Sequence, residues 1–554
     1  MKNLRNEDWR KSVIYQIYPK SFYSAKNQPT GDLAGIIEKL DYLAFLGVDY
    51  LWLTPIYPSP QRDNGYDVSD YRAIDPRYGT MEEFKTLLEE ARRRKIGIIM
   101  DMVFNHTSTD HKWFQEARKS PDNPYRSYYI WRDQPNNWKS KFGGSAWEYD
   151  EVAQQYYLHL FDKTQADLNW ENEEVRREIY KIMKFWADMG VAGFRLDVIN
   201  LISKDQRFPD AIGEGPMNDG RKFYTDGPRV HEFLQEMHRE VLEGTNLITV
   251  GEMSSTTIEH GVKYSRPDRK ELNMIFSFHH MKVDYPDGEK WVKGSFDLRK
   301  LKKVMSEWQK GMYEGGGWNA LFWCNHDQPR IVSRFGNETI YRRESATMLA
   351  TALHMLQGTP YIYQGEEIGM TNPHFDSIDE YRDVETLNAY RLHPDKEAIM
   401  EAIKQKSRDN SRTPMQWNSE KYAGFSTTEP WINVAPNYKE INVENALQDP
   451  RSILYHYKEL IRLRKTYDII TYGKYELLLE DHPRIWAYTR SLEDEALLVV
   501  NNFSEEEAEF ILPEGLPFAH WNSRVLIANY EDAPNDFRRI PLRPYESVVF
   551  HFTR

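Results

Sequence analysis

The segment VAGFRLDVIN, residues 191–200, ends a short apolar run with a guanidinium and a carboxylate, Arg195 and Asp197. Three other segments share this arrangement: IGIIMDMVFNH (96–106), LITVGEM (247–253) and ALFWCNHDQPR (320–330). Their polar side chains are Asp101, His106, Glu252, His326 and Asp327. A single acid at a strand end is usually a solvated loop residue, but several at the ends of successive buried strands are typical of a barrel whose C-terminal rim carries the chemistry. The pattern predicts an enzyme.

Eight short apolar runs, separated by amphipathic stretches, extend this pattern along the chain. The runs span 13–18, 50–53, 96–103, 193–198, 247–250, 274–278, 320–323 and 361–363. Helical periodicity is clear at 81–95 and at 173–190, and the second stretch ends in a glycine, as expected of a helix C-cap. The alternation predicts a (β/α)8 TIM barrel.

Two parts of the chain depart from a minimal barrel. Residues 105–169 are rich in Trp, Tyr, Asn and Asp without clear helical period, which predicts an inserted subdomain over the barrel mouth after strand 3. Alternating strands from residue 473 onward predict a separate C-terminal all-β domain, a β-sandwich. The barrel then comprises 1–104 and 170–472, the subdomain 105–169 and the last domain 473–554.

Composition excludes several classes of partner. The formal charge of -13 over 554 residues argues against nucleic acid, because neutralising phosphates needs a basic face. One cysteine, Cys324, cannot build a disulfide framework. The N-terminus lacks the apolar core of a signal peptide, and no later stretch has the length of a membrane span. We therefore expect a soluble cytoplasmic protein without nucleic-acid or membrane partners.

The strand-end carboxylates suit the cleavage of a bond between two sugars. One carboxylate attacks or stabilises the anomeric carbon and a second, protonated one delivers a proton to the leaving oxygen, roughly 5 Å away in a retaining enzyme. Asp197 and Glu252 end neighbouring strands, and Arg195 lies on the same strand face as Asp197, so we expect it to hold that carboxylate's pKa low. A partly closed pocket should raise the pKa of Glu252. For any one residue, a rim salt bridge or a solvated side chain remains an alternative.

The segments DMVFNH, GFRLDVIN, GEM and FWCNHDQPR resemble the four signature regions of the alpha-amylase family of glycoside hydrolases. YQIYPKSF, DNGYDV, LFDKTQADLNW and RDNSRTPMQW extend the resemblance to its alpha-glucosidase branch, over essentially the whole chain. The resemblance implies that Asp197 is the nucleophile, Glu252 the general acid/base and Asp327 a third carboxylate that holds sugar hydroxyls. It also implies glucose-binding roles for Asp63, Tyr66, His106, Phe161, Gln165, Arg195, His326 and Arg412.

Specificity within this branch depends on other residues. Val198 resembles the apolar residue of the members that cut 1,6-linked glucosides or trehalose 6-phosphate. GEMSSTT (251–257), DGRKFYTDGPR (219–229) and FSFHHMKVDYPDGEKW (276–291) resemble trehalose-6-phosphate hydrolases more than oligo-1,6-glucosidases. The resemblance thus implies a retaining glycosidase that splits this disaccharide phosphate, with an oligo-1,6-glucosidase as the alternative. A transglycosylase or sucrose isomerase would use the same intermediate and also remains open.

The last of these stretches is also basic in an acidic protein. Its cations are His279, His280, Lys282 and Lys290, directly after a predicted barrel strand. Such donors suit a phosphate dianion. The alternative is a solvated loop whose lysines are offset by Asp284, Asp287 and Glu289. The family's own basic loop favours phosphate binding.

The sequence of the loop after the first predicted strand argues against a bound metal ion. Many relatives carry a calcium loop there, but SFYSAKNQPTGDLAGI (21–36) has Ser24, Lys26 and Gln28 at the ligand positions and keeps only Asp32. Calcium needs several oxygen ligands, which a lysine ammonium opposes. We therefore expect no metal and no cofactor.

Overall fold

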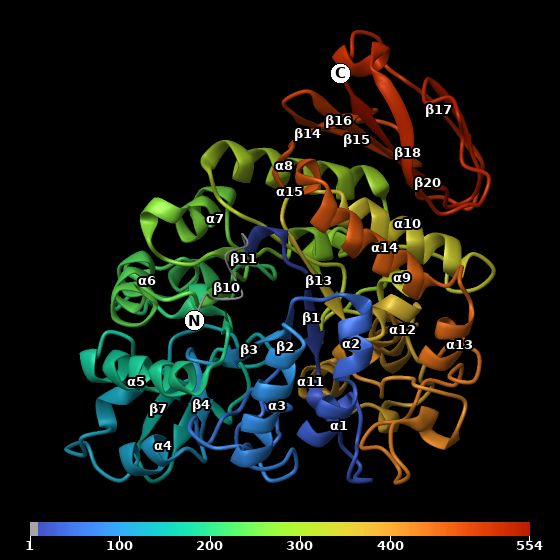
Figure 1. Ribbon diagram of the computed structural model, residues 1–554. Coiled ribbons are helices and arrows are strands. Elements are labelled where there is room, and N and C mark those ends of the chain that lie inside the picture. The colour runs from blue at the N-terminus through green and yellow to red at the C-terminus, as the bar shows by residue number, and fades with distance from the viewer. Residues whose placement is uncertain (1–8) are drawn as a thin grey trace.

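The computed structural model describes residues 9–554 and contains eight parallel strands at its centre (Figure 1). These are β1 (Ile14–Ile17), β2 (Tyr50–Leu53), β3 (Gly97–Met102), β9 (Gly193–Leu196), β10 (Ile248–Glu252), β11 (Met274–Phe276), β12 (Ala320–Leu321) and β13 (Thr359–Tyr363). Their order is β11-β10-β9-β3-β2-β1-β13-β12, and a parallel bridge between Ile275 and Asn319 joins the two ends. Each predicted run overlaps one strand, so the predicted barrel is confirmed.

Helices cover the outside of the strands. They include α1 (Leu33–Glu38), α2 (Leu40–Leu46), α3 (Met81–Arg93), α5 (Glu173–Met189), α6 (Val230–Met237), α7 (Ile258–Ser265), α8 (Leu298–Gly315), α10 (Arg342–His354) and α14 (Ile453–Thr466). Helix α3 begins at a capping box formed by Thr80 and Glu83, and α5 ends at Gly190 in the left-handed conformation (φ 102°), as the sequence predicts. Strands β1, β2, β9 and β13 are buried at every residue, as expected of parallel strands covered on both faces.

The inserted subdomain follows β3. It contains β4 (His106–Ser108), α4 (Lys112–Ala117), β5 (Trp131–Arg132), β6 (Trp147–Asp150), β7 (Gln155–Leu158) and β8 (Gln165–Asp167), in two small sheets. Its core includes Trp138 and Leu158, and these pack with Val198, Leu201 and Tyr224 from loops of the barrel. The subdomain is therefore fixed to the barrel rim by apolar contacts.

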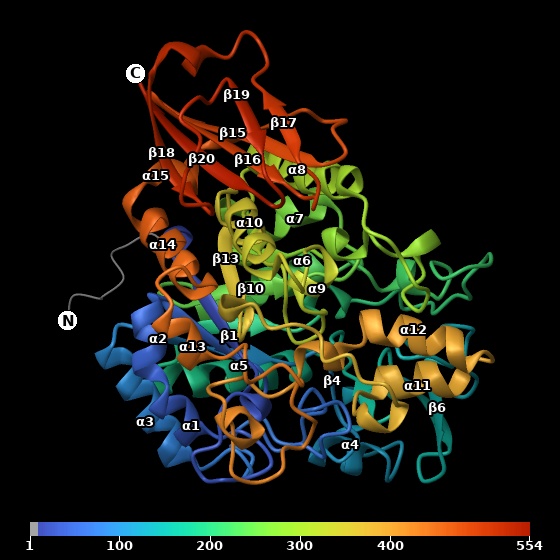
Figure 2. The same cartoon turned by 90° about the vertical axis from the view of Figure 1, so that its right-hand side faces the viewer.

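A second addition, after β13, was not predicted from the sequence. Helices α11 (Val384–Leu392) and α12 (Lys396–Lys406) form a hairpin that lies beside the inserted subdomain (Figure 2). Asn388 on α11 donates a hydrogen bond to the carbonyl oxygen of Phe142 at 3.2 Å, which links the two additions. The chain that leaves α12 carries Arg408 and Arg412 to the barrel mouth.

The C-terminal part of the chain is an all-β domain, as predicted. Its strands are β14 (Lys474–Leu478), β15 (Ile485–Leu492), β16 (Glu495–Asn502), β17 (Ala508–Ile511), β18 (Asn522–Ala528), β19 (Arg539–Leu542) and β20 (Ser547–Thr553). Five form one sheet in the order β14-β15-β16-β20-β18, and β17 pairs with β19. One face of the large sheet packs with Phe510 and Ile540 of the small sheet, while Trp486 and Tyr488 on its other face join the barrel core. In residues 9–554 no helix combines the length and the apolar character needed to cross a membrane.

Candidate active site

The C-terminal ends of the barrel strands bring polar side chains to one cavity of about 530 Å³. In the strand register, Arg195 lies beside Asp101 on β3 and beside Val250 on β10. Because parallel strands end at the same rim, Asp197 and Glu252 reach the cavity together, and Asp327 joins them from the loop after β12. The structure therefore brings the three predicted catalytic carboxylates into one site.

The Arg195 guanidinium, 1% exposed, bridges three carboxylates. Its Nη1 lies 2.6 Å from Oδ1 of Asp197 and 3.0 Å from Oδ1 of Asp101, and its Nη2 lies 2.6 Å from Oε2 of Glu252. The predicted pairing of Arg195 with Asp197 is confirmed. Contact with Glu252 as well was not expected, because the sequence separates the two residues by 57 positions.

The turn after Asp197 also orients Glu252. Val198 adopts a left-handed conformation (φ 36°), which is strained for a β-branched residue. In this conformation its backbone N–H donates to Oε2 of Glu252 at 3.1 Å. Oε2 thus accepts from both Val198 and Arg195, which leaves Oε1 as the oxygen able to carry a proton.

Burial raises the pKa values of both carboxyl groups. Arg195 lowers the pKa of Asp197 as predicted, but burial outweighs this effect and raises the pKa to about 6, so the expected low pKa of Asp197 is wrong. Burial raises the pKa of Glu252 well above its usual value, and the charge of Asp197 adds to the increase. The hydrogen bond between the two groups lowers the pKa of Asp197 and raises that of Glu252, which favours an ionised Asp197 beside a protonated Glu252, as a nucleophile and an acid require.

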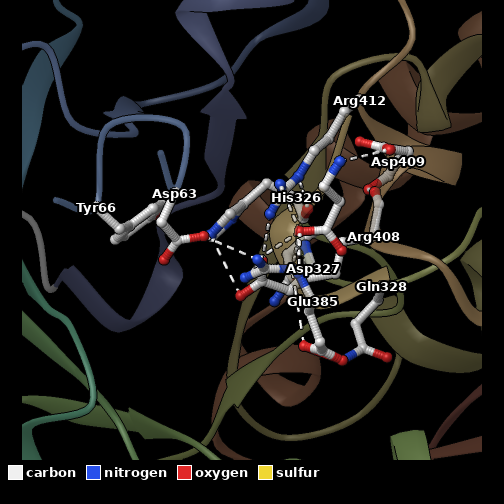
Figure 3. A network of polar contacts seen from close by, with 12 residues as sticks. Asp63, Tyr66, His326, Asp327, Gln328, Glu385, Arg408, Asp409 and Arg412 are labelled. Carbon is white, nitrogen blue, oxygen red and sulfur yellow. Dashed lines mark hydrogen bonds and ion pairs between the residues drawn. The ribbon is translucent and has the colours of Figure 1, made fainter. Parts of the chain in front are cut away.

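Asp327 occupies the opposite electrostatic environment (Figure 3). Burial opposes its ionisation, but His326, Arg408 and Arg412 together hold the pKa of Asp327 well below its usual value. Arg412 Nη2 lies 2.8 Å and Arg408 Nη1 3.4 Å from Oδ1 of Asp327. A permanently ionised acceptor results, suited to sugar hydroxyl donors. Sequence reasoning missed Arg408, whose only signal is its place in the segment RDNSRTPMQW.

The predicted glucose-binding residues form two layers. Asp63, Tyr66, His106 and Phe161 line the cavity. Gln165, Arg195, His326 and Arg412 lie behind them, buried, and hold them in place. Gln165 Nε2 donates to Oδ2 of Asp63 at 2.9 Å, and the Tyr66 ring stacks on His326 at 5.0 Å between centroids.

Three of the four predicted phosphate-binding side chains of the basic loop line the cavity: His279, Lys282 and Lys290. Burial lowers the pKa of His279, whose Nε2 donates to the carbonyl oxygen of Thr256 at 2.6 Å. The prediction that His280 binds phosphate is not supported. Its Nε2 donates to the carbonyl oxygen of Phe322 at 2.9 Å, and its ring is buried behind the cavity wall. Burial lowers the pKa of His280 to about 4, so it carries no charge at neutral pH.

The acids of this loop do not neutralise its lysines. Asp284 pairs with Arg334 at 2.7 Å. Lys290 pairs instead with Glu385 of helix α11, and within residues 9–554 Lys282 donates no side-chain hydrogen bond and forms no ion pair. The observed ion pairs therefore argue against the alternative, a solvated loop whose own acids offset its lysines.

The loop after β1 uses Asp32 as a structural acceptor. Its carboxylate accepts hydrogen bonds from the backbone N–H groups of Ala25, Lys26 and Gly35, the last at the N-terminus of α1. The Lys26 ammonium pairs with Glu83. In the described part of the chain, no group of three or more His, Cys, Asp or Glu side chains could hold a metal ion. Independence from metal stays a prediction.

Exhaustive chelation with EDTA should leave both kcat/KM and the melting temperature unchanged, because backbone donors already satisfy Asp32. Activity assays and thermal unfolding before and after chelation test this, with a sample given EDTA and excess calcium as the control. A drop that calcium restores would mean that the loop binds a cation.

A barrel whose rim brings two buried carboxyl groups of raised pKa to one guanidinium has the arrangement expected of a glycoside hydrolase. The family model of the alpha-amylase catalytic domain matches residues 16–473, and that of the SusG C-terminal domain of alpha-amylases matches 485–549. The chain therefore belongs to the alpha-amylase family.

Known proteins of two activities resemble this chain over almost its full length. A trehalose-6-phosphate hydrolase of Bacillus subtilis (strain 168) is 59% identical, with 100% of both chains covered. An oligo-1,6-glucosidase of Parageobacillus thermoglucosidasius is 55% identical, with 98% of each covered. The crystal structure of Bacillus licheniformis trehalose-6-phosphate hydrolase has a TM-score of 0.94 at 59% identity and covers 99% of this chain and 100% of its own. Because the identities differ little, the choice between substrates depends on the site itself.

Proposed function

We propose that the protein hydrolyses α,α-trehalose 6-phosphate to glucose and glucose 6-phosphate. The observation that carries this proposal is a pair of cations in the cavity wall: Lys282 lines the cavity without an ion pair in the described structure, and the charge of Lys290 acts on it. A neutral disaccharide offers such cations only hydroxyl oxygens, whereas a phosphate monoester carries about −1.5 to −2 charges at neutral pH.

In the proposed mechanism Asp197 attacks the anomeric carbon while Glu252 protonates the bridging oxygen, so glucose 6-phosphate leaves and a glucosyl ester remains on Asp197. Glu252, now ionised, then removes a proton from water, which releases glucose with retained configuration. The bridging contacts of Arg195 to both carboxylates support a short separation, of the ~5 Å that retention requires. Asp327 accepts hydrogen bonds from the glucose hydroxyls.

The second candidate is an oligo-1,6-glucosidase, which the 55% identical relative supports. Val198 fits either substrate class. A sucrose isomerase or transglycosylase would share the glucosyl ester and differ only in the acceptor, so product analysis distinguishes it.

Replacing Lys282 with alanine should raise KM for trehalose 6-phosphate about tenfold or more, because a charge-assisted hydrogen bond contributes roughly 1.5 to 3 kcal/mol. Lys290→Ala should raise KM at least as much, since it also removes the nearer cation from the Glu385 carboxylate in the cavity, whose remaining partner is Arg408 Nε at 3.8 Å. The measurement is the ratio of kcat/KM for trehalose 6-phosphate to that for p-nitrophenyl α-glucoside, which has no phosphate.

Lys293 provides a matched control, because it belongs to the same loop but pairs with Glu401 on the surface. Lys293→Ala should leave the ratio unchanged. A parent enzyme that prefers isomaltose to trehalose 6-phosphate, or lysine variants that lose activity equally on both substrates, would replace this proposal with the oligo-1,6-glucosidase.

A further inference from the structure

Four cationic side chains line the cavity besides Arg408, and they come from different elements. Lys282 and Lys290 belong to the loop after β11, Lys141 belongs to the inserted subdomain, and Arg221 follows β9 in a long loop. The charges of Arg221 and Lys282 both act on Lys141. The set is therefore one cluster, of which the basic loop supplies half.

Acidic residues compensate two of these cations. Arg221 is held by Asp219 in a bidentate pair, Nε to Oδ1 and Nη2 to Oδ2, both at 2.9 Å. Lys290 is held by Glu385. The third acid of the outer cavity, Glu289, forms no side-chain hydrogen bond or ion pair within residues 9–554. Two ammonium groups, those of Lys141 and Lys282, thus face the cavity without a carboxylate partner in the described structure.

The position of Lys141 is fixed by its surroundings. Its backbone N–H donates to the carbonyl oxygen of Leu160 at 2.8 Å, and the next residue, Phe142, accepts a hydrogen bond from Asn388 of α11. Its half-buried side chain extends past the Tyr224 ring, with Nζ 5.5 Å from the ring centroid. The ammonium is thus held at the cavity wall, although it makes no hydrogen bond there.

Without a ligand, the positive charge of Lys141 is unfavourable at this position. Burial, together with Arg221 and Lys282, lowers the pKa of Lys141 to about 7. Packing of the aliphatic stem beside Tyr224 explains where the side chain lies, but it does not explain why the charges of Arg221 and Lys282 act on the same ammonium group. A ligand with two negative charges would instead match the two unpaired ammonium groups.

We propose that Lys141 is a second phosphate-binding residue and therefore sets specificity together with Lys282. This inference rests on the proposed function. The two ammonium groups would bind the phosphate oxygens from different elements, the inserted subdomain and the loop after β11. Arg221, whose other donors are taken by Asp219, Pro216 and Met217, would contribute an N–H of Nη1. The inserted subdomain would then recognise the phosphorylated sugar as well as the glucose.

The test compares Lys141→Met, which keeps the stem and removes the charge, with Lys141→Arg, which keeps the charge. Lys141→Met should raise KM for trehalose 6-phosphate about tenfold and lower its kcat/KM relative to p-nitrophenyl α-glucoside by the same factor. Product inhibition by glucose 6-phosphate should weaken in parallel, unlike inhibition by glucose. Lys141→Arg should recover most of the loss. Lys139→Ala, exposed and two residues away, is the matched control and should change none of these values.

Three outcomes separate the possible failures. A parent enzyme without preference for trehalose 6-phosphate would overturn the proposed function and this inference together. If the parent prefers that substrate and Lys282→Ala loses the preference, but Lys141→Met keeps KM within about twofold, this inference alone is wrong. Equal losses on both substrates with a lower melting temperature would make Lys141 a structural residue, which also overturns it.

Discussion

Alanine at position 197 should lower kcat by several orders of magnitude on every glycoside, because it removes the carboxylate proposed to form the glucosyl ester. The fold should persist. The Arg195 guanidinium keeps its contacts to Asp101 and Glu252, at 3.0 and 2.6 Å, so removal of Asp197 leaves no unpaired buried cation. Steady-state kinetics and thermal unfolding measure the two halves of this prediction.

A mechanism-based fluoroglucoside provides the complementary evidence. It should label the parent enzyme at Asp197 alone, as read by peptide mass spectrometry, and should not label Asp197→Ala. Asp188→Ala is a suitable control, because this aspartate is exposed at the far end of α5. Labelling at Asp327, or near-normal turnover of Asp197→Ala, would contradict the assignment.

The structure explains why the barrel and the grouping of the strand-end carboxylates could be predicted from sequence. Both depend on local patterns: a parallel strand buried on two faces is a continuous apolar run, and the rim residue follows it directly. Asp197 and Glu252 each have such a run before them. Neighbouring strands then bring these ends together, which requires only the order of the strands.

Other parts of the site depend on contacts that no local pattern encodes. Glu385 comes from α11 and Arg408 from the chain that leaves α12, and their partners, Lys290 and Asp327, are distant in sequence. His280 shows the limit within one segment: adjacent residues of the 3-10 helix His279–Lys282 point in different directions, so one imidazole faces the cavity and the other Phe322. A basic motif predicts that a loop is positively charged, but it does not predict which of the loop's side chains line the cavity.

The pKa of Asp197 also depends on the folded site and not on the local sequence alone. Sequence proximity identifies Arg195 as its partner, and the pairing is real. The sign of the shift, however, depends on how completely the carboxylate is removed from water and on the nearby charge of Asp101, both of which are properties of the folded site.

Replacing Glu252 with glutamine should separate the two steps of the reaction. Glucosylation of Asp197 by a natural disaccharide needs a proton donor, so it should slow by about 10²- to 10⁴-fold, the usual contribution of general acid catalysis. Aryl glucosides with good leaving groups need no such proton and should be partly spared. Oε2 is the oxygen that accepts from Arg195 and Val198, and the glutamine carbonyl can keep those two contacts.

Deglucosylation gives the second measurement, because the variant also lacks the base that activates water. Azide, a nucleophile that needs no base, should rescue turnover of an activated aryl glucoside and yield the α-glucosyl azide, the product expected of a retaining enzyme. Glu240→Gln, an exposed substitution after α6, should show neither the loss nor the rescue. Equal losses on natural and aryl substrates without rescue would assign the acid/base role elsewhere.

The pH profiles of kcat/KM for the parent enzyme and for Glu252→Gln should differ only in the alkaline limb. In the parent enzyme kcat/KM should fall below about pH 6 as Asp197 gains a proton, and fall again at higher pH as Glu252 loses the proton it must donate. The acid limb follows from a nucleophile that is active when ionised, and the alkaline limb from an acid that is active when protonated. With an activated aryl glucoside Glu252→Gln should keep the acid limb and lose the alkaline one, because its amide does not titrate. Retention of both limbs in the variant would mean that another group supplies the proton, despite the raised pKa that burial and Asp197 give to Glu252.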